Sequence, residues 1–173
     1  DQLFTSGKAG GKMIEVGCWA HGRRKFFEAK DTDRERSRWA VDAIRRLYQV
    51  EWDARDLDAT ARKALRQERS TPILDSIHAW LKVQSVQVLP KAPMGEAIYY
   101  ALAQWKALNR YLEDGDLAID NNACERLLRG ACLGRKNYLF FGSEEGGRWA
   151  AVLYSLVESC KLHRLDPFVY LKD

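Results

Sequence analysis

The stretch that begins near residue 122 places one acid and several bases within a few helical turns. Glu125 is next to Arg126, Arg129 follows one turn later, and Arg135 and Lys136 come soon afterwards. A carboxylate on the first turn of a helix can bind Mg²⁺ through oxygen. Arginine and lysine bind the phosphate groups on which such a metal ion acts. This combination indicates metal-dependent chemistry on phosphate esters.

The same residues also fit a purely structural role. An asparagine followed three residues later by a glutamate, as in Asn122 and Glu125, resembles a capping box. Arg129 would then form an ordinary ion pair with Glu125 across one turn. Chemistry with two metal ions would require further carboxylates. Asp120 is the nearest one, and a turn residue is an equally good interpretation of it.

A basic loop bounded by Gly134 and Gly142 is expected to follow this helix. Tyr138, Phe140 and Phe141 are interleaved with its charges. Aromatic residues among basic ones are typical of nucleic-acid-binding surfaces, where they stack on bases. Packing into a strand or a core is the alternative, and we favour it for at least one of the phenylalanines.

A second basic cluster consists of Arg23, Arg24 and Lys25, next to Phe26 on a short predicted helix. It is either a solvated helix face or a set of phosphate contacts. The net charge of +4 over 173 residues permits an anionic partner but does not require one. Local clusters therefore carry more information than the total charge.

The composition is that of a globular chain, with 46% hydrophobic and 30% charged residues. No apolar run approaches the ~20 residues of a membrane span. No signal peptide is visible, so we expect a cytoplasmic protein without a membrane partner. The chain starts at Asp1 rather than at Met, which predicts a fragment of a longer protein.

The four cysteines lie far apart and are expected to be reduced, buried and small apolar residues. Cys18 and His21 form a Cys-x-x-His pair. A zinc site requires about four ligands, and no second pair at metal spacing is present. A zinc-stabilised scaffold is therefore the weakest of the alternatives.

Hydrophobic periodicity predicts a mainly α fold with one to three short strands. We expect a strand over 13–19 and an antiparallel helix pair over 33–69, with Arg62 and Arg66 on the outer face. Ser70, Thr71 and Pro72 indicate the start of a new helix. Further helices are expected over these ranges: 94–112, 149–160 with its apolar residues buried, and 167–171 capped by Asp166.

Several blocks of the chain resemble the insertion sequence 66 family of transposases. Residues 18–26, CWAHGRRKF, are similar to the family block CWAHARRKF, and residues 119–126, IDNNACER, are similar to IDNNxxER. Residues 134–147 are similar to GRKNWLFxGSxxGG, and the C-terminal DPxxYL signature is also present. The blocks occur in order and span nearly the whole chain.

This resemblance implies a DDE transposase with an RNase H-like core, in which two aspartates and a glutamate hold two Mg²⁺ or Mn²⁺ ions. Glu125 matches the glutamate. Residues 31–115 match an all-helical insertion, 1–30 the last strand and helix of a partial core, and 116–173 the core helix with the basic loop and C-terminal helices. The implied partners are transposon-end and target DNA, a homo-oligomer is compatible with the family, and the implied location is the bacterial nucleoid.

The chain departs from the family pattern in ways that bear on activity. Both family aspartates should lie upstream of Cys18, and Asp1 by register is not one of them. The chain alone is therefore expected to be inactive and to hold no metal. The resemblance implies DNA binding by Arg126, Arg129, Arg135 and Lys136, with the cluster of residues 23–25 as weaker candidates. A non-catalytic helical module that binds DNA or protein is the alternative.

Overall fold

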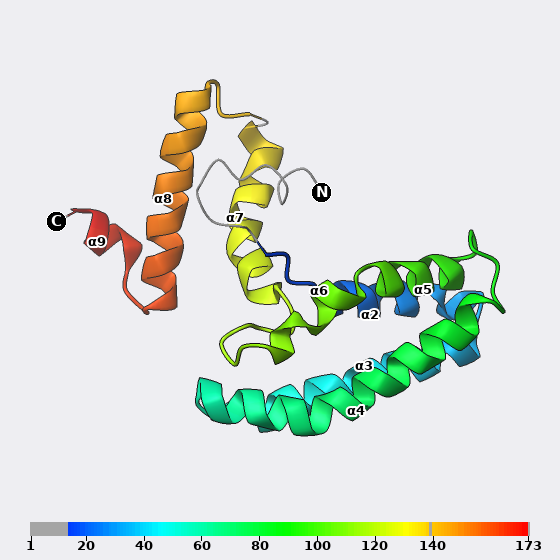
Figure 1. Ribbon diagram of the computed structural model, residues 1–173. Helices are drawn as coiled ribbons and strands as arrows, with labels where there is room; N and C mark the ends of the chain where they lie inside the picture. The colour runs from blue at the N-terminus through cyan, green and yellow to red at the C-terminus, as the bar shows by residue number, and fades with distance from the viewer. Residues whose placement is uncertain (1–13, 139, 173) are drawn as a thin grey trace. The chain divides into compact units, whose positions relative to one another are not determined.

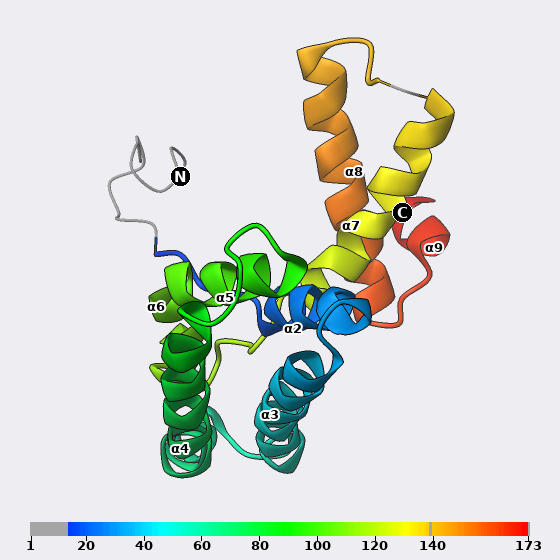
Figure 2. The same cartoon turned by 90° about the vertical axis from the view of Figure 1, so that its right-hand side faces the viewer.

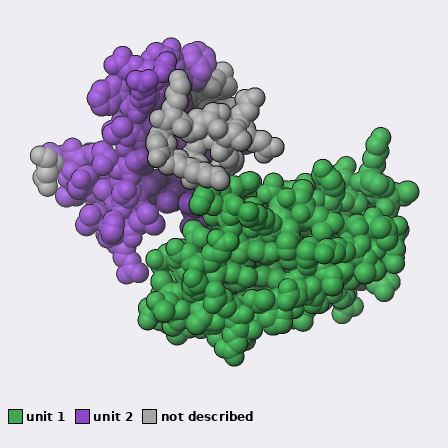
Figure 3. All heavy atoms as spheres, in the orientation of Figure 1, with its two compact units in different colours: residues 1–121 green, residues 122–173 purple. Residues whose placement is uncertain are grey.

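The computed structural model describes residues 14–138 and 140–172, which form two compact units, residues 1–121 and 122–173 (Figure 3). The first unit contains helices α2 (Trp19–Glu28), η1 (Ala29–Asp31), α3 (Arg34–Asp53), α4 (Ala59–Ser85), α5 (Pro93–Ala103), α6 (Trp105–Asn109) and η2 (Arg110–Leu112). The second contains α7 (Asn122–Tyr138), α8 (Glu144–Leu162) and α9 (Pro167–Lys172) (Figure 1). The predicted mainly α fold is confirmed.

Residues 14–18 do not form the strand that was expected over 13–19, and Met13 lies outside the described residues. The amide of Gly17 donates instead to the carbonyl of Ala107 at 2.8 Å. A Cβ atom on Gly17 would lie 2.7 Å from the amide nitrogen of Leu108, so the two backbones approach as closely as glycine allows. The segment is therefore held against α6 and pairs with no strand in the described part of the chain.

Helices α3 and α4 form the predicted antiparallel pair and lie side by side (Figures 1 and 2). Each begins at an aspartate cap. Asp33 accepts a hydrogen bond from the Arg36 amide at 3.2 Å, and Asp58 accepts one from the Ala61 amide at 2.8 Å. The short connection between the helices fixes their antiparallel order.

Pro72 lies inside α4, so the helix start expected at Ser70 is wrong. Pro72 lacks an amide donor and removes one backbone hydrogen bond, yet the helix continues on both sides. Burial explains this continuity, because Ser70 and Leu74 are buried on one face while Pro72 is exposed. Packing of that face outweighs the local preference for a break.

The helix expected over 94–112 is divided at Gln104 into α5, α6 and η2. Carbonyl groups in its second half accept hydrogen bonds from residues near the start of the chain. The Ala107 carbonyl accepts from the Gly17 amide, and the Leu108 carbonyl accepts from the Trp19 indole nitrogen at 2.9 Å. These tertiary bonds satisfy the carbonyls that a longer helix would have used.

Aromatic rings fill the core between α2, α3, α4 and α6. Trp39 is stacked on Trp80 with ring centroids 4.4 Å apart, and Trp19 meets Trp105 edge to face at 6.0 Å. His78 is half-buried and stacked on Trp105 at 4.5 Å, so it packs against the aromatic core. Burial holds the pKa of His78 below its usual value.

Arg66 is buried, so its expected place on the outer face of α4 is wrong. Its guanidinium binds both carboxylate oxygens of Glu51, at 2.8 and 2.6 Å. It also donates to the carbonyls of Tyr111 and Asp114, at 2.9 and 3.0 Å. An arginine can be buried here because the N–H groups of its guanidinium donate to carboxylate and carbonyl oxygens.

Arg62 was also expected on the outer face, and it is half-buried. It donates to the carbonyls of Leu57 at 2.7 Å and Gly115 at 2.9 Å. A Cβ atom on Gly115 would lie 1.9 Å from the carbonyl oxygen of Ala59, so the turn is pressed against the start of α4. Two arginines of α4 thus hold the chain that follows η2.

In the second unit, α8 begins at Ser143, whose hydroxyl accepts from the Gly146 amide at 2.9 Å. The predicted cap of α9 is confirmed, because Asp166 accepts from the Phe168 amide at 2.8 Å. The predicted burial of α8 is confirmed at Cys160 and wrong at Trp149 and Leu153, which are 63% and 52% exposed. Ala150, Leu156 and Val157 are half-buried. Two long helices and one short helix offer too little surface to cover that apolar face.

All four cysteines are free, but burial holds only for Cys18 and Cys160. Cys124 and Cys132 are exposed, contrary to the prediction, because the side of α7 that carries them has no cover within its own unit.

In the described part of the chain, no helix is both long enough and apolar enough to cross a membrane.

We expect Arg66→Met to lower the free energy of unfolding by about 3 to 5 kcal/mol, because it leaves Glu51 and two carbonyls without their buried donor. Arg69→Met is the matched control. Arg69 pairs with Asp53 at 2.8 Å, but its side chain is 44% exposed, against 2% for Arg66. The control should lose less than about 1 kcal/mol in urea denaturation. Equal losses in both variants would contradict the assignment.

Candidate functional site

Helix α7 carries most of the residues for which the sequence predicted chemistry. It begins at Asn122 and places Glu125 in its first turn, where the helix dipole favours a carboxylate. It continues through Gly134 to Tyr138, so the basic loop expected from Gly134 is wrong. Residues 135 and 136 are helical instead.

Glycines inside α7 weaken it without ending it. Gly130 and Gly134 each cost about 1 kcal/mol relative to alanine, which a helix of four to five turns tolerates. The backbone leaves the helical region only later, at Gly142, whose φ is +76°. Left-handed backbone at a glycine is the usual signal for a chain reversal, and Gly142 provides it just before α8.

One face of α7 collects the acid and most of the bases. Glu125, Arg129 and Lys136 are spaced four and seven residues apart, which puts them in one line along a helix. Arg126 lies beside this line, three residues before Arg129. All four side chains are exposed. Arg135 lies in the same helix.

The N-terminal half of this face forms a shallow surface groove. The residues that line it are Asn122, Glu125, Arg126, Arg129 and Cys132. The structure thus brings Glu125, Arg126 and Arg129 together and adds Lys136 farther along the same face. Arg126 and Arg129 lie about one helical turn apart, and Lys136 lies about two turns beyond Arg129. This row of exposed cations suits the repeated negative charge of a phosphodiester backbone.

The described residues do not make a complete metal site by themselves. Among them, no group of three or more histidine, cysteine, aspartate and glutamate side chains could hold a metal ion. Glu125 is the single acidic residue in the sequence of α7, and its helical neighbours are cationic. Glu125 could therefore supply one ligand of a shared site. The same finding gives no support to zinc at Cys18 and His21.

The cluster of residues 23–25 lies on α2, in the first unit. Arg23 and Arg24 are exposed, whereas the Lys25 ammonium lies 5.1 Å from the centre of the Tyr100 ring. A cation held over an aromatic face is worth about 0.5–1 kcal/mol at an exposed site. Lys25 therefore has a structural partner within its own unit.

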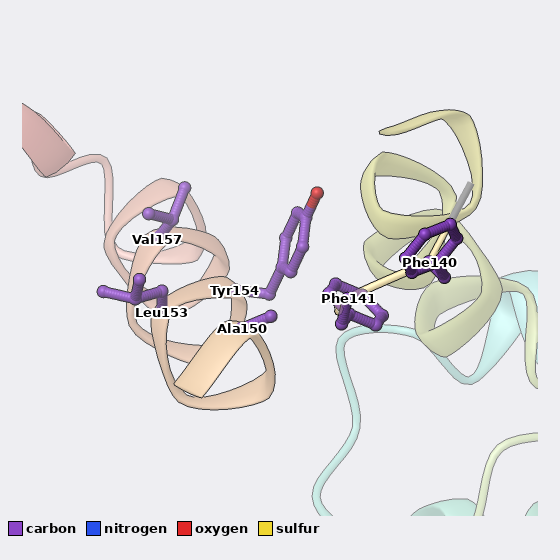
Figure 4. A pocket seen from close by; sticks show the side chains of 6 residues that line it. All are labelled: Phe140, Phe141, Ala150, Leu153, Tyr154 and Val157. Atoms are coloured by element: carbon purple, nitrogen blue, oxygen red, sulfur yellow. The ribbon is translucent and has the colours of Figure 1, made fainter. Parts of the chain in front are cut away.

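Phe140 and Phe141 take part in an apolar pocket of the second unit. Four residues of α8 complete its lining: Ala150, Leu153, Tyr154 and Val157 (Figure 4). In this view the Tyr154 side chain stands between α8 and Phe141. Phe140 is 73% exposed and Phe141 is 42% exposed, so neither is a core residue of this unit.

Asp120 has a structural partner that sequence analysis missed. The Tyr48 hydroxyl donates to its carboxylate at 2.9 Å. Burial raises the pKa of Tyr48, and the hydrogen bond to Asp120 and its charge raise that pKa further. Tyr48 therefore remains a protonated donor at physiological pH. Tyr48 lies four residues after Ile44, a helical spacing that by itself indicates packing and gives no sign of this hydrogen bond.

Comparison with known proteins agrees with the arrangement of these blocks. The family profile described as "Transposase IS66 family" matches residues 3–149. The chain belongs to the IS66 transposase family. This confirms the resemblance that the sequence blocks suggested. No solved structure matches the chain.

Three proteins of Sinorhizobium fredii (strain NBRC 101917 / NGR234), each described as an uncharacterized protein, are similar to this chain. The relative y4hP is 38% identical over 169 residues, which cover 90% of this chain and 31% of the relative. The relative y4qI is 39% identical over 159 residues, covering 91% and 30%. The relative y4jD is 38% identical over 157 residues, covering 90% and 31%. The chain thus spans less than a third of the length of these relatives.

We expect Gly130→Ala to stabilise the chain by about 0.5–1 kcal/mol, because Gly130 lies in the interior of α7. The added Cβ atom would lie 3.8 Å from Glu158 Oε1, an ordinary contact. Gly142→Ala is the matched control, and its left-handed backbone should make the same change destabilising by about 1 kcal/mol. Thermal unfolding followed by circular dichroism measures both. A loss of stability in Gly130→Ala would place the helix end near residue 130 instead.

Proposed function

We propose that this chain is the part of an IS66-family transposase that supplies one catalytic carboxylate and a phosphate-binding helix face. The whole protein would cleave and transfer DNA strands at transposon ends in a metal-dependent reaction. The observation that supports this proposal is the single face of α7 on which Glu125, Arg129 and Lys136 are aligned, with Arg126 beside them.

The bases of this face have the simpler role. Arg126 and Arg129 border the groove, and Lys136 extends the row of charge. Arginine binds phosphate through two parallel N–H groups, which fixes orientation as well as charge. These three residues would hold the DNA backbone beside Glu125, with Arg135 as a further contact. Arg23, Arg24 and Lys25 remain weaker candidates on a different unit.

Glu125 would contribute one oxygen ligand to Mg²⁺ or Mn²⁺, ions that prefer carboxylate oxygen. The remaining ligands would come from outside this chain, as the two aspartates of the RNase H-like family pattern require. The relatives are more than three times as long as the matched region, which leaves room for them. On this proposal the chain alone neither binds the metal ions tightly nor cuts DNA.

A second candidate function is non-catalytic DNA binding by the chain alone. The observation that favours it is the pairing of an exposed cationic row with a single acid on α7. The two candidates differ in a measurable way, because a binding module would show salt-dependent duplex affinity without nicking under any metal condition. Under the first proposal, by contrast, a full-length protein that carries this chain would cut DNA.

We expect Glu125→Gln in such a full-length protein to reduce metal-dependent strand cleavage by about a thousandfold or more. A catalytic metal ion contributes several kcal/mol to transition-state stabilisation, and glutamine is a poorer ligand for it. Glu145→Gln is the matched control, since Glu145 is an exposed acid in the first turn of α8. Gel-based cleavage of end-labelled transposon DNA measures the rate. Retained cleavage by Glu125→Gln would rule out the catalytic role.

We also expect the chain to bind duplex DNA with an affinity that falls as salt rises. Changing Arg126, Arg129 and Lys136 together to glutamine should reduce the slope of log K against log salt by about 2 to 3, roughly one for each lost phosphate contact. Arg148→Gln is the control, because Arg148 is paired with Glu144 at 2.7 Å. Fluorescence anisotropy at several salt concentrations gives the slopes. An unchanged slope in the triple variant would refute phosphate binding by this face.

A further inference from the structure

The segment just before α7 is held by several parts of the first unit. The Ile119 carbonyl accepts from the Trp19 amide at 3.1 Å, and Trp19 itself is fully buried. Ile119 is also buried in the core of this unit. The next residue, Asp120, accepts from the Tyr48 hydroxyl at 2.9 Å. Two consecutive residues are thus bound from two different helices, α2 and α3.

The position of this segment in the sequence gives the contacts their importance. Asp120 lies two residues before Asn122, the first residue of α7, and five before Glu125. Upstream, Arg66 and Arg62 hold the carbonyls of Asp114 and Gly115. The stretch that leads to α7, residues 114–120, is therefore held by hydrogen bonds at both of its ends.

We propose that Tyr48 is a positioning residue for the end of the first unit: its hydrogen bond to Asp120 fixes the residues immediately before the helix that carries Glu125. The tyrosine is well suited to this role because it is half-buried and lies on α3, a helix of 20 residues capped by Asp33. The Tyr48 hydroxyl is held in place because the helix that carries it is long and well packed. The acceptor that it holds is the last side chain before Asn121 and α7.

This assignment gives Asp120 a role in shaping the chain, because its carboxylate accepts from the Tyr48 hydroxyl. The consequence for strand cleavage rests on the proposed function of Glu125. The consequence for the local structure does not, because it can be measured on this chain without DNA or metal.

The first test is amide hydrogen exchange in Tyr48→Phe, which keeps the ring and removes the donor. We expect the amides of Trp19 and Arg126 to exchange about five- to tenfold faster, because a lost hydrogen bond makes local opening easier by that factor. The exchange of the Leu81 amide, in the C-terminal part of α4, should be unchanged. Tyr99→Phe is the control, as Tyr99 is 75% exposed. Unchanged exchange at Trp19 and Arg126, or an equal rise at Leu81, would overturn the proposal.

Substitutions of the acceptor test the same bond from the other side. Asp120→Asn keeps an oxygen that can accept from Tyr48, so we expect exchange close to that of the original chain. Asp120→Ala removes the acceptor and should reproduce the effect of Tyr48→Phe. If Asp120→Asn behaved like Asp120→Ala, the charge of Asp120 and not the hydrogen bond would be responsible, and the assignment would be wrong.

The second test uses a full-length protein that carries this chain. There Tyr48→Phe should lower kcat for strand cleavage by about tenfold or more while KM for DNA stays the same, since small misplacement of a reacting group reduces rate rather than binding. A rise in KM with unchanged kcat would overturn the positioning role. Failure of the proposed function would show differently: cleavage would be absent in the unsubstituted protein, whereas the exchange result on the chain would stand.

Discussion

The buried guanidinium of Arg66 is the interaction on which the first unit depends. It joins α4 to Glu51 of α3 and to the carbonyls that follow η2, so one side chain links two helices and a turn. Such a group is costly to desolvate, and it is stable because the fork of N–H groups meets acceptors on each side. The turn that it holds leads, a few residues later, to Ile119 and Asp120.

The first unit can be understood as a scaffold that determines where one short segment lies. Its aromatic core, with Trp39 stacked on Trp80 and Trp19 beside Trp105, keeps α2, α3 and α4 in place. Residues of these helices then form hydrogen bonds with the 107–120 region. Apolar packing alone would permit sliding of this region, whereas directional hydrogen bonds from Trp19 and Tyr48 restrict it. Packing gives stability here, and the polar bonds give position.

Sequence patterns predicted the helices well where periodicity and caps agreed. The α3–α4 pair, the Asp33 and Asp58 caps and the Asp166 cap belong to this group. Patterns failed where tertiary packing overrode local preference, as at Pro72. Arg66 was misplaced because its charge was taken to imply exposure. Its four-residue spacing with Ser70 and Leu74, which are buried, was the signal that should have indicated burial.

The candidate site was likewise predicted in part from the sequence. The residues on α7 could be found from their types, and their common face could be inferred only once the helix was known to continue past Gly134. That continuity has a consequence for how the sequence can change. A loop absorbs an inserted residue, but one insertion in a helix turns everything beyond it by about 100°. Under the proposed function, the number of residues between Arg129 and Lys136 would therefore matter as much as their charge.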